Sequence, residues 1–411
     1  MVYYLLRFPQ KGGEWVSWIK DSLRDFWERG DKLLLCLCLL ASGYGLVLIY
    51  SATRYLTVNQ NRSVIVQTLG ILLGVVVYIL LSSVDMELFV EKSWKLLLIF
   101  NLGFNLLVRV PGLGVARGSN LSWIRFPGLP IDIQPAEVTK LTFVLLFAYQ
   151  CVKLQKRGIS RPTSVLFLLS NLAVTAGVIA AATRDFGMVL VYIFLFALLC
   201  WTAGVKLRWF ALGGAVSVGG VAYLWPRLQS SYLGERVTVV IDHILGNQET
   251  LYAQTQGRGW QQTRSILAIG SGGLTGQGYL KGIQTQSPYE TSLNARYTDE
   301  IFAVCGEELG LIGCMVIILL LCAIIIRCIW VAQRAPSPMT ALVAMGYAGM
   351  LLFQSVLNIG MCLYLLPIVG LTLPFFSYGG SSIITMFAAM GVVSSVKTRS
   401  LPSWLKDRNR L

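Results

Sequence analysis

The segment GWQQTRSILAIGSGGLTGQGYLKGIQTQSPYETSLNARYTDEIFAVCGEELGLIG (residues 259–313) joins a polar, glycine-rich stretch to the head of a long apolar run. Acidic side chains stand at this junction (Asp299, Glu300) and inside the apolar run itself (Glu307, Glu308). A run of about 20 apolar residues crosses a bilayer as a helix, and charges within it are costly unless they are paired or functional. We therefore interpret this junction as the centre of the molecule, and the rest of the chain as scaffold around it.

The composition places the chain in a membrane. Of its 411 residues, 55% are hydrophobic and only 13% are charged, and the mean hydropathy is +0.64. Soluble domains carry about 25% charged residues. The apolar residues come in long runs without period-two alternation, which favours an all-α polytopic membrane protein over a β-barrel. The net charge of +14 does not indicate nucleic-acid binding, because cytoplasmic loops of membrane proteins are rich in Lys and Arg.

The cysteines and the histidine exclude two kinds of chemistry. All nine cysteines lie in or at the ends of apolar runs, so a disulfide framework in the polar loops is not expected. The one histidine, His243, argues against a histidine-based metal site or catalytic triad. We treat the identity of any metal as unknown.

Hydropathy predicts ten transmembrane helices between a cytoplasmic segment, residues 1–31, and a basic cytoplasmic tail, residues 397–411. The first segment is either a helix lying on the membrane surface or a short unstructured tail. The ten helices make one membrane domain, residues 32–396. They are predicted at 32–51, 63–83, 94–110, 135–153, 163–182, 187–204, 207–225, 300–327, 339–363 and 373–396.

The distribution of Lys and Arg predicts that both termini are cytoplasmic, because most basic residues fall in the segments that then lie inside. Three polar insertions would face outward: residues 111–134, the short turn at 183–186, and a large extracellular loop at about 226–299 between spans 7 and 8. Loops of that length are usually functional.

Asp299 is the first candidate for chemistry. A carboxylate at the outer membrane surface could take a proton from a hydroxyl group. The alternative is structural, because Thr298 or Asp299 would make a good N-cap for the following helix. For Glu307 and Glu308 we favour packing by salt bridge to a neighbouring helix over direct catalysis.

Two further polar groups interrupt apolar sequence on the outer side. Glu137 and Lys140 begin a helix and share one of its faces, so Lys140 either pairs with Glu137, extends its side chain to the membrane surface, or holds a phosphate or a carboxylate. Arg184 and Asp185 either form a tight turn or a buried pair facing an outer cavity, and we favour the second.

Three segments resemble the SEDS family (shape, elongation, division and sporulation), whose members include RodA, FtsW and SpoVE. They are WI…IQPAEVTKL (123–141), AIGSGGLTGQG…YTDEIFAVCGEELGLIG (268–313) and NIGM…LLP…LTLPFFSYGGSS (358–382). The resemblance covers nearly the whole chain from the first predicted span to the last.

The resemblance implies a peptidoglycan glycosyltransferase of the bacterial plasma membrane. Such an enzyme polymerises lipid II, the undecaprenyl-diphosphate-linked disaccharide, and works with a class B penicillin-binding protein, a transpeptidase. It implies that Asp299 is the catalytic residue and that Glu137, Lys140, Trp123 and Ser377 support the site.

The sequence departs from the family pattern around its catalytic aspartate. Tyr297 stands where the family usually has His, and Glu300 replaces an aromatic residue. Ser122 replaces a basic residue common before the Trp-Ile pair, and Arg184 replaces the proline of a Pro-Asp turn. The role of Tyr297 in proton handling is therefore open.

One inverting displacement would convert the α-linked diphosphate of lipid II into a β-1,4 bond. It needs a base, which we assign to Asp299, and positive charge for the departing diphosphate, from Lys140, Arg258, Arg264 or a divalent cation such as Mg²⁺ or Mn²⁺. The alternatives are a lipid II flippase and a non-catalytic scaffold for a penicillin-binding protein. The first would spread polar residues through the membrane depth, and the second would tolerate loss of Asp299. Whether the protein serves elongation, division or sporulation stays open.

Overall fold

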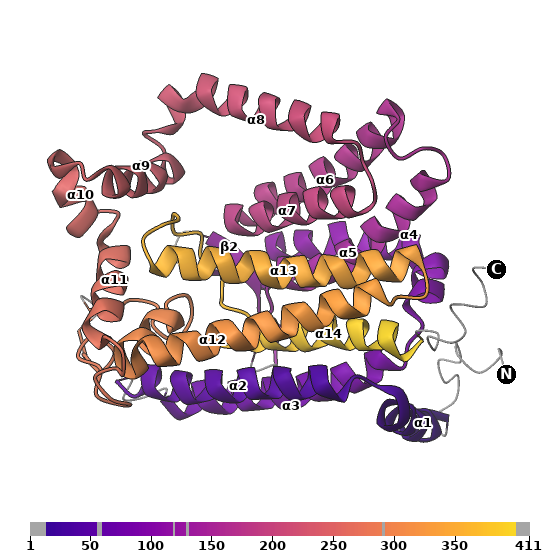
Figure 1. The fold of residues 1–411 in the computed structure, drawn as a ribbon, viewed down its shortest axis with the longest axis horizontal. Coiled ribbons are helices and arrows are strands. Elements are labelled where there is room, and N and C mark those ends of the chain that lie inside the picture. The colour runs from indigo at the N-terminus through magenta and orange to yellow at the C-terminus, as the bar shows by residue number, and fades with distance from the viewer. Residues whose placement is uncertain (1–13, 56–59, 118–119, 129–130, 290–291, 400–411) are drawn as a thin grey trace.

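The structure is a computed structural model that describes residues 14–55, 60–117, 120–128, 131–289 and 292–399. Long helices, roughly parallel to one another, form the body of the molecule (Figure 1). They are α2 (Lys32–Thr53), α3 (Gln60–Ser82), α4 (Met86–Leu106), α5 (Pro135–Gln155), α6 (Pro162–Thr183), α7 (Phe186–Thr202), α8 (Leu207–Leu228), α12 (Ile301–Gln333), α13 (Pro338–Cys362) and α14 (Gly380–Thr398).

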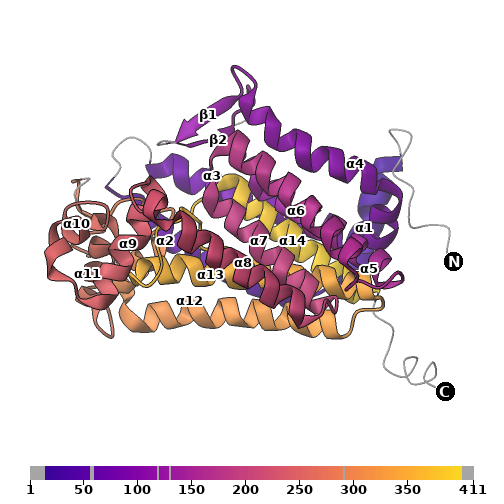
Figure 2. The same ribbon diagram turned by 90° about the horizontal axis from the view of Figure 1, so that it is seen from above.

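Smaller elements lie at the two ends of this bundle (Figure 1). One end carries α1 (Glu14–Arg29), and the other carries α9 (Tyr232–Leu245), η2 (Gln248–Thr250), α10 (Leu251–Thr255) and α11 (Trp260–Gly272). A two-stranded antiparallel hairpin, β1 (Gly114–Arg117) and β2 (Asn120–Ile124), follows the short helix η1 (Leu107–Arg109). Figure 2 shows this hairpin projecting beside α4.

Among the described residues, seven helices are long and apolar enough to span a membrane: α2, α3, α6, α8, α12, α13 and α14. The apolar helix α7 is shorter. The structure thus agrees with a helical, multi-pass membrane protein, whereas the predicted count of ten spans stays a prediction. Two predicted boundaries were wrong. The span expected at 94–110 is the helix Met86–Leu106, which Asp85 caps, and the span expected at 373–396 begins only at Gly380.

The core of the bundle is built around α14, most of whose residues are buried. Glycines let α3 and α14 approach closely. A Cβ added at Gly391 would lie 2.7 Å from the carbonyl oxygen of Tyr78, and one at Gly74 would lie 2.7 Å from Phe387. Small residues at helix contacts are how membrane helices gain van der Waals packing without a hydrophobic driving force between them.

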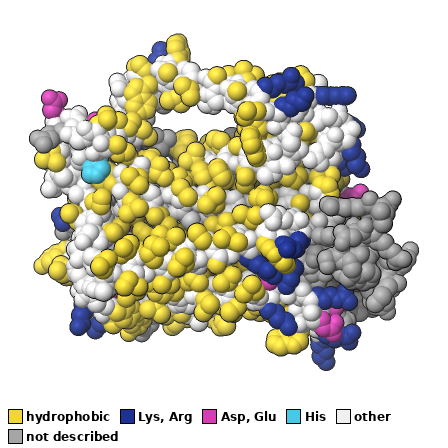
Figure 3. Space-filling view, viewed as in Figure 1, with side chains coloured by type: hydrophobic (Ala, Val, Ile, Leu, Met, Phe, Trp, Pro, Cys, Tyr) yellow, Lys and Arg dark blue, Asp and Glu magenta, His cyan; other side chains and the backbone are white. Residues whose placement is uncertain are grey.

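Helix α8 is the exception to this packing, because no residue in its apolar stretch is buried. It arches over α6 and α7 on its way to α9 (Figure 1). The space-filling view shows an opening between α8 and the rest of the molecule, and hydrophobic side chains over the broad face of the bundle (Figure 3). A helix that is apolar all round and lies apart from the protein core needs lipid around it.

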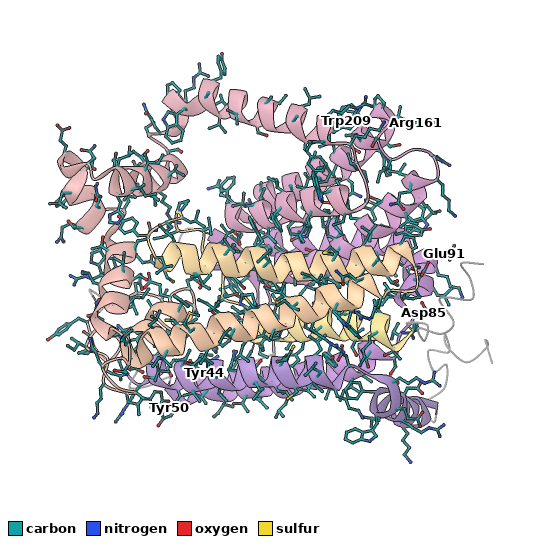
Figure 4. The ribbon with its side chains drawn as sticks, viewed as in Figure 1. Tyr44, Tyr50, Asp85, Glu91, Arg161 and Trp209 are labelled. Atoms are coloured by element: carbon teal, nitrogen blue, oxygen red, sulfur yellow. The ribbon has the colours of Figure 1, made fainter. Side chains whose placement is uncertain are left out.

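The end of the bundle near α1 is closed by ion pairs. The buried carboxylate of Asp31, at the start of α2, accepts two hydrogen bonds from Arg327, at 2.9 and 3.0 Å. Lys397 lies 3.5 Å from the same carboxylate, and Arg399 lies 3.4 Å from Asp85. Asp85, Glu91 and Arg161 all lie at this end, away from α9–α11 (Figure 4). The basic residues predicted to be cytoplasmic thus include several that gather at one end.

Of the predicted N-terminal segment, residues 14–29 form a helix, and residues 1–13 lie outside the described residues, as do residues 400–411 of the tail. The placement of α1 on a membrane surface stays a prediction. The large loop expected at 226–299 begins within the end of α8 and contains α9, η2, α10 and α11.

Candidate active site

Asp299 lies in a series of turns immediately before α12, at the end of the bundle that carries α9–α11. The N-cap of α12 is Glu300, and no side chain caps it, so the alternative role of Asp299 as a helix cap is not what the structure shows. The main-chain oxygen of Asp299 accepts a hydrogen bond of 2.7 Å from the side-chain amide of Asn358 on α13. The backbone of the residue is therefore fixed while its carboxylate points elsewhere.

Asp299 is half-buried, and groups from three other segments act on its carboxylate or lie near it. A Cβ atom added at Gly370 would lie 3.8 Å from Oδ2 of Asp299 and would meet no other atom within 4 Å. Burial, and then the charge of Asp185, raises the pKa of Asp299 to about 6, while Arg236 on α9 lowers it. A carboxyl group with a pKa near neutrality is a much better proton acceptor than an exposed aspartate, and it is still ionised at pH 7.

Asp185 supplies a second buried carboxylate to this region. It caps α7 by accepting a hydrogen bond of 3.1 Å from the amide of Met188, and its Oδ2 accepts one of 2.7 Å from the side chain of Gln134. Burial raises the pKa of Asp185 to about 6. Arg184, in contrast, is exposed and ends α6 in a left-handed conformation (φ 55°). The expected buried Arg–Asp unit is thus wrong for Arg184 and right for Asp185.

Glu137 and Lys140 form a buried ion pair on α5, with 2.6 Å between Lys140 Nζ and Glu137 Oε2. Lys140 also donates to Gln354 Oε1 at 3.2 Å, and Ser382 Oγ donates to Glu137 Oε2 at 3.3 Å. Pairing is therefore the correct one of the alternatives for Lys140, and its side chain does not reach the membrane surface. The pair joins α5 to α13 and α14. Gln134, the residue immediately before α5, binds Asp185 through its side chain and so links Asp185 to this helix.

Ser377 fixes the turn that carries Asp299. Its hydroxyl donates to the main-chain oxygen of Thr298 at 2.6 Å and accepts from the amide of Leu373 at 2.8 Å. Next to it, the amide of Tyr378 donates to the oxygen of Tyr297 at 2.8 Å, and the two tyrosine rings meet edge to face. Ser377 therefore acts on the backbone of the turn, and the aromatic ring of Tyr297 packs against another ring.

Glu307 and Glu308 hold the loop that follows α11, and the expected salt bridges to a neighbouring helix are wrong. Glu307 accepts hydrogen bonds from the amides of Gln284 and Thr285 at 2.7 and 2.8 Å. Glu308 accepts from Ser51 of α2 at 2.5 Å and from the side chain of Gln286 at 2.8 Å. Amide and hydroxyl donors thus take the place of the cations expected beside these two buried acids.

This loop is bound so tightly because α12 is broken at Gly310, where φ is 66° and ψ is −162°. The break frees carbonyl groups of the helix, and loop amides bind two of them. The amide of Gln277 donates to the oxygen of Glu307, and that of Gly278 donates to the oxygen of Glu308, at 2.9 and 3.0 Å. Only glycine fits at position 276, where a Cβ would lie 2.1 Å from the oxygen of Glu308. The first turns of α12 and the glycine-rich loop therefore form one rigid unit below Asp299.

Known proteins resemble this chain over nearly its whole length. The model of the FtsW/RodA/SpoVE family, described as a cell cycle protein, matches residues 31–401. The chain belongs to the FtsW/RodA/SpoVE family.

Curated relatives match this chain over about nine-tenths of its length. It is 31% identical over 376 residues to a probable peptidoglycan glycosyltransferase FtsW of Geobacter metallireducens, covering 90% of this chain and 96% of the relative. It is 28% identical to the peptidoglycan glycosyltransferase MrdB of Escherichia coli K12, covering 91% and 96%.

Two solved structures share the fold. A chain from a study of the structural coordination of polymerization and crosslinking by a peptidoglycan synthase complex superimposes with a TM-score of 0.71 at 25% identity, covering 90% of this chain and 97% of that one. The rod shape determining protein RodA of Thermus thermophilus has a TM-score of 0.61 at 24% identity, covering 91% and 98%, and shows the similarity of the fold.

The remaining predicted site residues of this FtsW/RodA/SpoVE protein are Arg258, Arg264 and Trp123. Arg258 is exposed and forms an ion pair of 2.5 Å with Glu235 at the edge of a cleft of about 450 Å³ between α9 and α10. Arg264 is half-buried on α11, and Trp123 is half-buried in β2, where it pairs with Val115. The cation whose charge lowers the pKa of Asp299 is Arg236, which also donates to the oxygen of Ile368 at 2.6 Å.

Sequence analysis missed Arg236, Asn358 and Arg296. Arg236 and Arg296 lie in the large loop among other polar residues, and nothing in the local pattern distinguishes them. Asn358 was part of a recognised segment, but its pairing with the main chain of Asp299 depends on the tertiary fold. The described residues contain no group of three or more His, Cys, Asp or Glu side chains that could hold a metal ion. A dedicated metal cage does not fit this donor set.

Proposed function

We propose that this protein is a peptidoglycan glycosyltransferase that polymerises lipid II on the outer face of the bacterial plasma membrane. The observation that carries the proposal is the carboxylate of Asp299, half-buried beside Asp185 and Arg236, with a pKa raised to about 6. Two further findings support the proposal. The relatives are named as a probable peptidoglycan glycosyltransferase and a peptidoglycan glycosyltransferase, and the chain shares its fold with a chain from a peptidoglycan synthase complex.

The proposed topology has ten spans, α2 to α8 and α12 to α14, with both termini in the cytoplasm. The ion-paired end near α1 is then cytoplasmic, and α9–α11 with the turns up to Glu300 form the large extracellular loop between spans 7 and 8. The excess of basic residues at the α1 end supports this orientation. Asp299 then lies at the outer membrane surface.

In the proposed reaction, an acceptor hydroxyl attacks the anomeric carbon of the donor sugar from the face opposite the diphosphate. The new glycosidic bond forms while the bond to the diphosphate oxygen breaks, which inverts the configuration. Asp299 takes the hydroxyl proton, and the leaving diphosphate carries away the electron pair of the broken bond. Arg236 is the positive group of the site that can offset the developing charge on the diphosphate.

Asp185 and the buried Glu137–Lys140 pair keep the surroundings of Asp299 fixed. Gln134 links the two, because its side chain binds Asp185 while its main chain enters α5. A fixed, partly dehydrated setting strengthens electrostatic effects on the reacting groups. A magnesium or manganese ion that arrives with the substrate diphosphate stays part of the proposal, and no step above depends on it.

The hydrocarbon tail of the substrate needs a route along the protein that remains in contact with lipid. The opening beside α8 supplies one, since α8 exposes apolar side chains along its length, among them Val216, Val218, Val221 and Tyr223. The class B penicillin-binding protein is the proposed partner, because a chain of similar fold comes from a peptidoglycan synthase complex that coordinates polymerization and crosslinking.

The test is polymerisation of labelled lipid II by the purified protein, with and without its transpeptidase partner and with a divalent cation present. Wild type should produce glycan ladders, and Asp299→Ala and Asp299→Asn should not. Glu249→Gln, which removes an exposed acid of the same outer loop, is the matched control and should behave as wild type. Ladders of equal strength from both Asp299 variants would refute the assignment of the base. No ladder from any sample would favour a flippase or a non-catalytic scaffold instead.

A further inference from the structure

Glu300, the residue that follows Asp299, is an unusual buried acid. Only 1% of its surface is exposed, and its Oε2 has no hydrogen-bond partner. The other acids buried near the head of α12, Glu307 and Glu308, are surrounded by donors. A buried polar atom without a partner costs free energy, so its presence beside the proposed base calls for an explanation.

The groups packed around Glu300 do not neutralise a negative charge. From α11 comes the neutral side chain of Gln261, and from α13 comes the thiol of Cys362. Its own segment contributes Asp299, which is itself acidic, and Arg296. Arg296 is committed elsewhere, because it donates to main-chain oxygens of the loop at 2.5 to 3.1 Å and lies over the ring of Tyr55.

These surroundings favour the uncharged form of Glu300. Burial raises the pKa of Glu300 well above its usual value, and the charge of Asp299 raises it further, while Gln261 and Arg296 lower it. A protonated carboxyl can still donate to or accept from Gln261, and it leaves one oxygen unpaired at a smaller cost than a carboxylate would.

We propose that Glu300 is a positioning residue that keeps its proton while Asp299 works as the base, so that the two adjacent carboxyl groups together carry a single negative charge. This inference rests on the proposed function above. In each transfer the acceptor proton goes to Asp299 and returns to solvent, and Glu300 exchanges none. Because the family pattern described above has an aromatic residue here, the property belongs to this chain.

The single charge matters because the substrate is an anionic diphosphate. Loss of the proton from Glu300 at high pH would place a second negative charge beside Asp299, in a setting where little water screens it. The donor would then bind less well, and kcat/KM would fall. The rate profile should therefore have two limbs, an acid limb from Asp299 and an alkaline limb from Glu300.

The first test compares the pH dependence of kcat/KM for wild type, Glu300→Gln and the exposed control Glu249→Gln. Above the alkaline midpoint, kcat/KM of wild type and of the control should fall by up to about tenfold for each pH unit. Glu300→Gln imitates the protonated acid, so it should keep the acid limb and stay within about twofold of its plateau at the same pH. An unchanged alkaline limb in Glu300→Gln, or loss of activity at every pH in a variant that unfolds at the wild-type temperature, would overturn the proposal.

The second test does not depend on polymerisation. Infrared spectra at pH 8 should contain the carbonyl stretch of a buried protonated carboxyl in wild type and in Glu249→Gln, and this band should be missing from Glu300→Gln. Asp185 and Asp299, with pKa values of about 6, are ionised at that pH and do not contribute. If Glu300→Gln removes no such band, Glu300 is ionised and the proposal is wrong, whether or not the protein makes glycan. A failure of the proposed function would instead leave the band intact and all ladders absent.

Discussion

Replacing Asp299 by Asn should abolish polymerisation and at the same time stabilise the protein at alkaline pH. The folded state raises the pKa of Asp299 from an ordinary value of 3.8 to about 6. The folded protein therefore binds more protons than the unfolded chain between these values, and its stability falls as the pH rises from about 4 to about 6. Above pH 6 the full cost of burying the charge is present, and below pH 4 it is absent.

The size of the effect follows from the shift. A shift of about 2 pKa units corresponds to about 3 kcal/mol for a fully buried group. Asp299 is only half-buried, so solvent screening reduces this, and we expect about 1 to 2 kcal/mol. For a chain of this length that is a rise in Tm of about 1 to 2 °C. Loss of a general base lowers kcat by about 10² to 10⁴.

The assay measures thermal unfolding of wild type and Asp299→Asn in detergent at pH 8 and at pH 4, together with lipid II polymerisation at pH 8. The variant should unfold at a higher temperature at pH 8 only, and it should give no ladder. A variant that is less stable than wild type at pH 8 would refute the argument that the carboxylate is held at a cost. A variant that still polymerises would refute its role as the base.

Three further outcomes follow from the same contacts. Polymerisation by wild type should fall about tenfold between pH 7 and pH 5, because Asp299 becomes protonated around pH 6, and a pH–rate profile flat across this range would contradict it. Gly276→Ala should lower Tm and activity together, because its Cβ would meet the oxygen of Glu308 at 2.1 Å where φ is 81°; wild-type Tm would show that the loop can shift. Lys140→Met should lower the free energy of unfolding by about 3 kcal/mol, since it leaves Glu137 buried without its cation. Adding Glu137→Gln should restore much of the lost stability, and denaturation of the single and double variants measures both effects.

The sequence was sufficient to predict the helical membrane fold and the position of Asp299 at the head of a span. Both depend on patterns along the chain, since a run of apolar residues has to cross the bilayer and a polar residue at its end lies at the surface. The same logic placed Asp185 in a turn between two apolar helices. The pairing of Glu137 with Lys140 was also available, because residues three apart share a helix face.

The partners of Glu307 and Glu308 could not be predicted in this way. Hydropathy indicates that two acids lie within a span and need partners, but it does not indicate that α12 breaks at Gly310 and admits a loop. Arg236 was missed for a related reason. Its contact with the Asp299 region requires the fold of α9 against the segment around Ile368, which is distant in sequence. The start of α4 was predicted too late because that helix begins at a polar cap, Asp85, and not at an apolar residue.

The arrangement around Asp299 indicates how the chain holds this proposed base in place. The segment that passes in front of Asp299 has no regular structure, yet side chains of three helices bind its carbonyl oxygens. Gln262 of α11 binds that of Leu366, Arg236 of α9 that of Ile368, and Asn358 of α13 that of Leu371, at 2.6 to 2.7 Å. Asn358 binds Asp299 with the same nitrogen, so the segment and the base share one anchor. Because two of these anchors come from the region between α8 and α12, that region helps to hold the segment beside Asp299, and changes in how it packs should reach Asp299 through this segment.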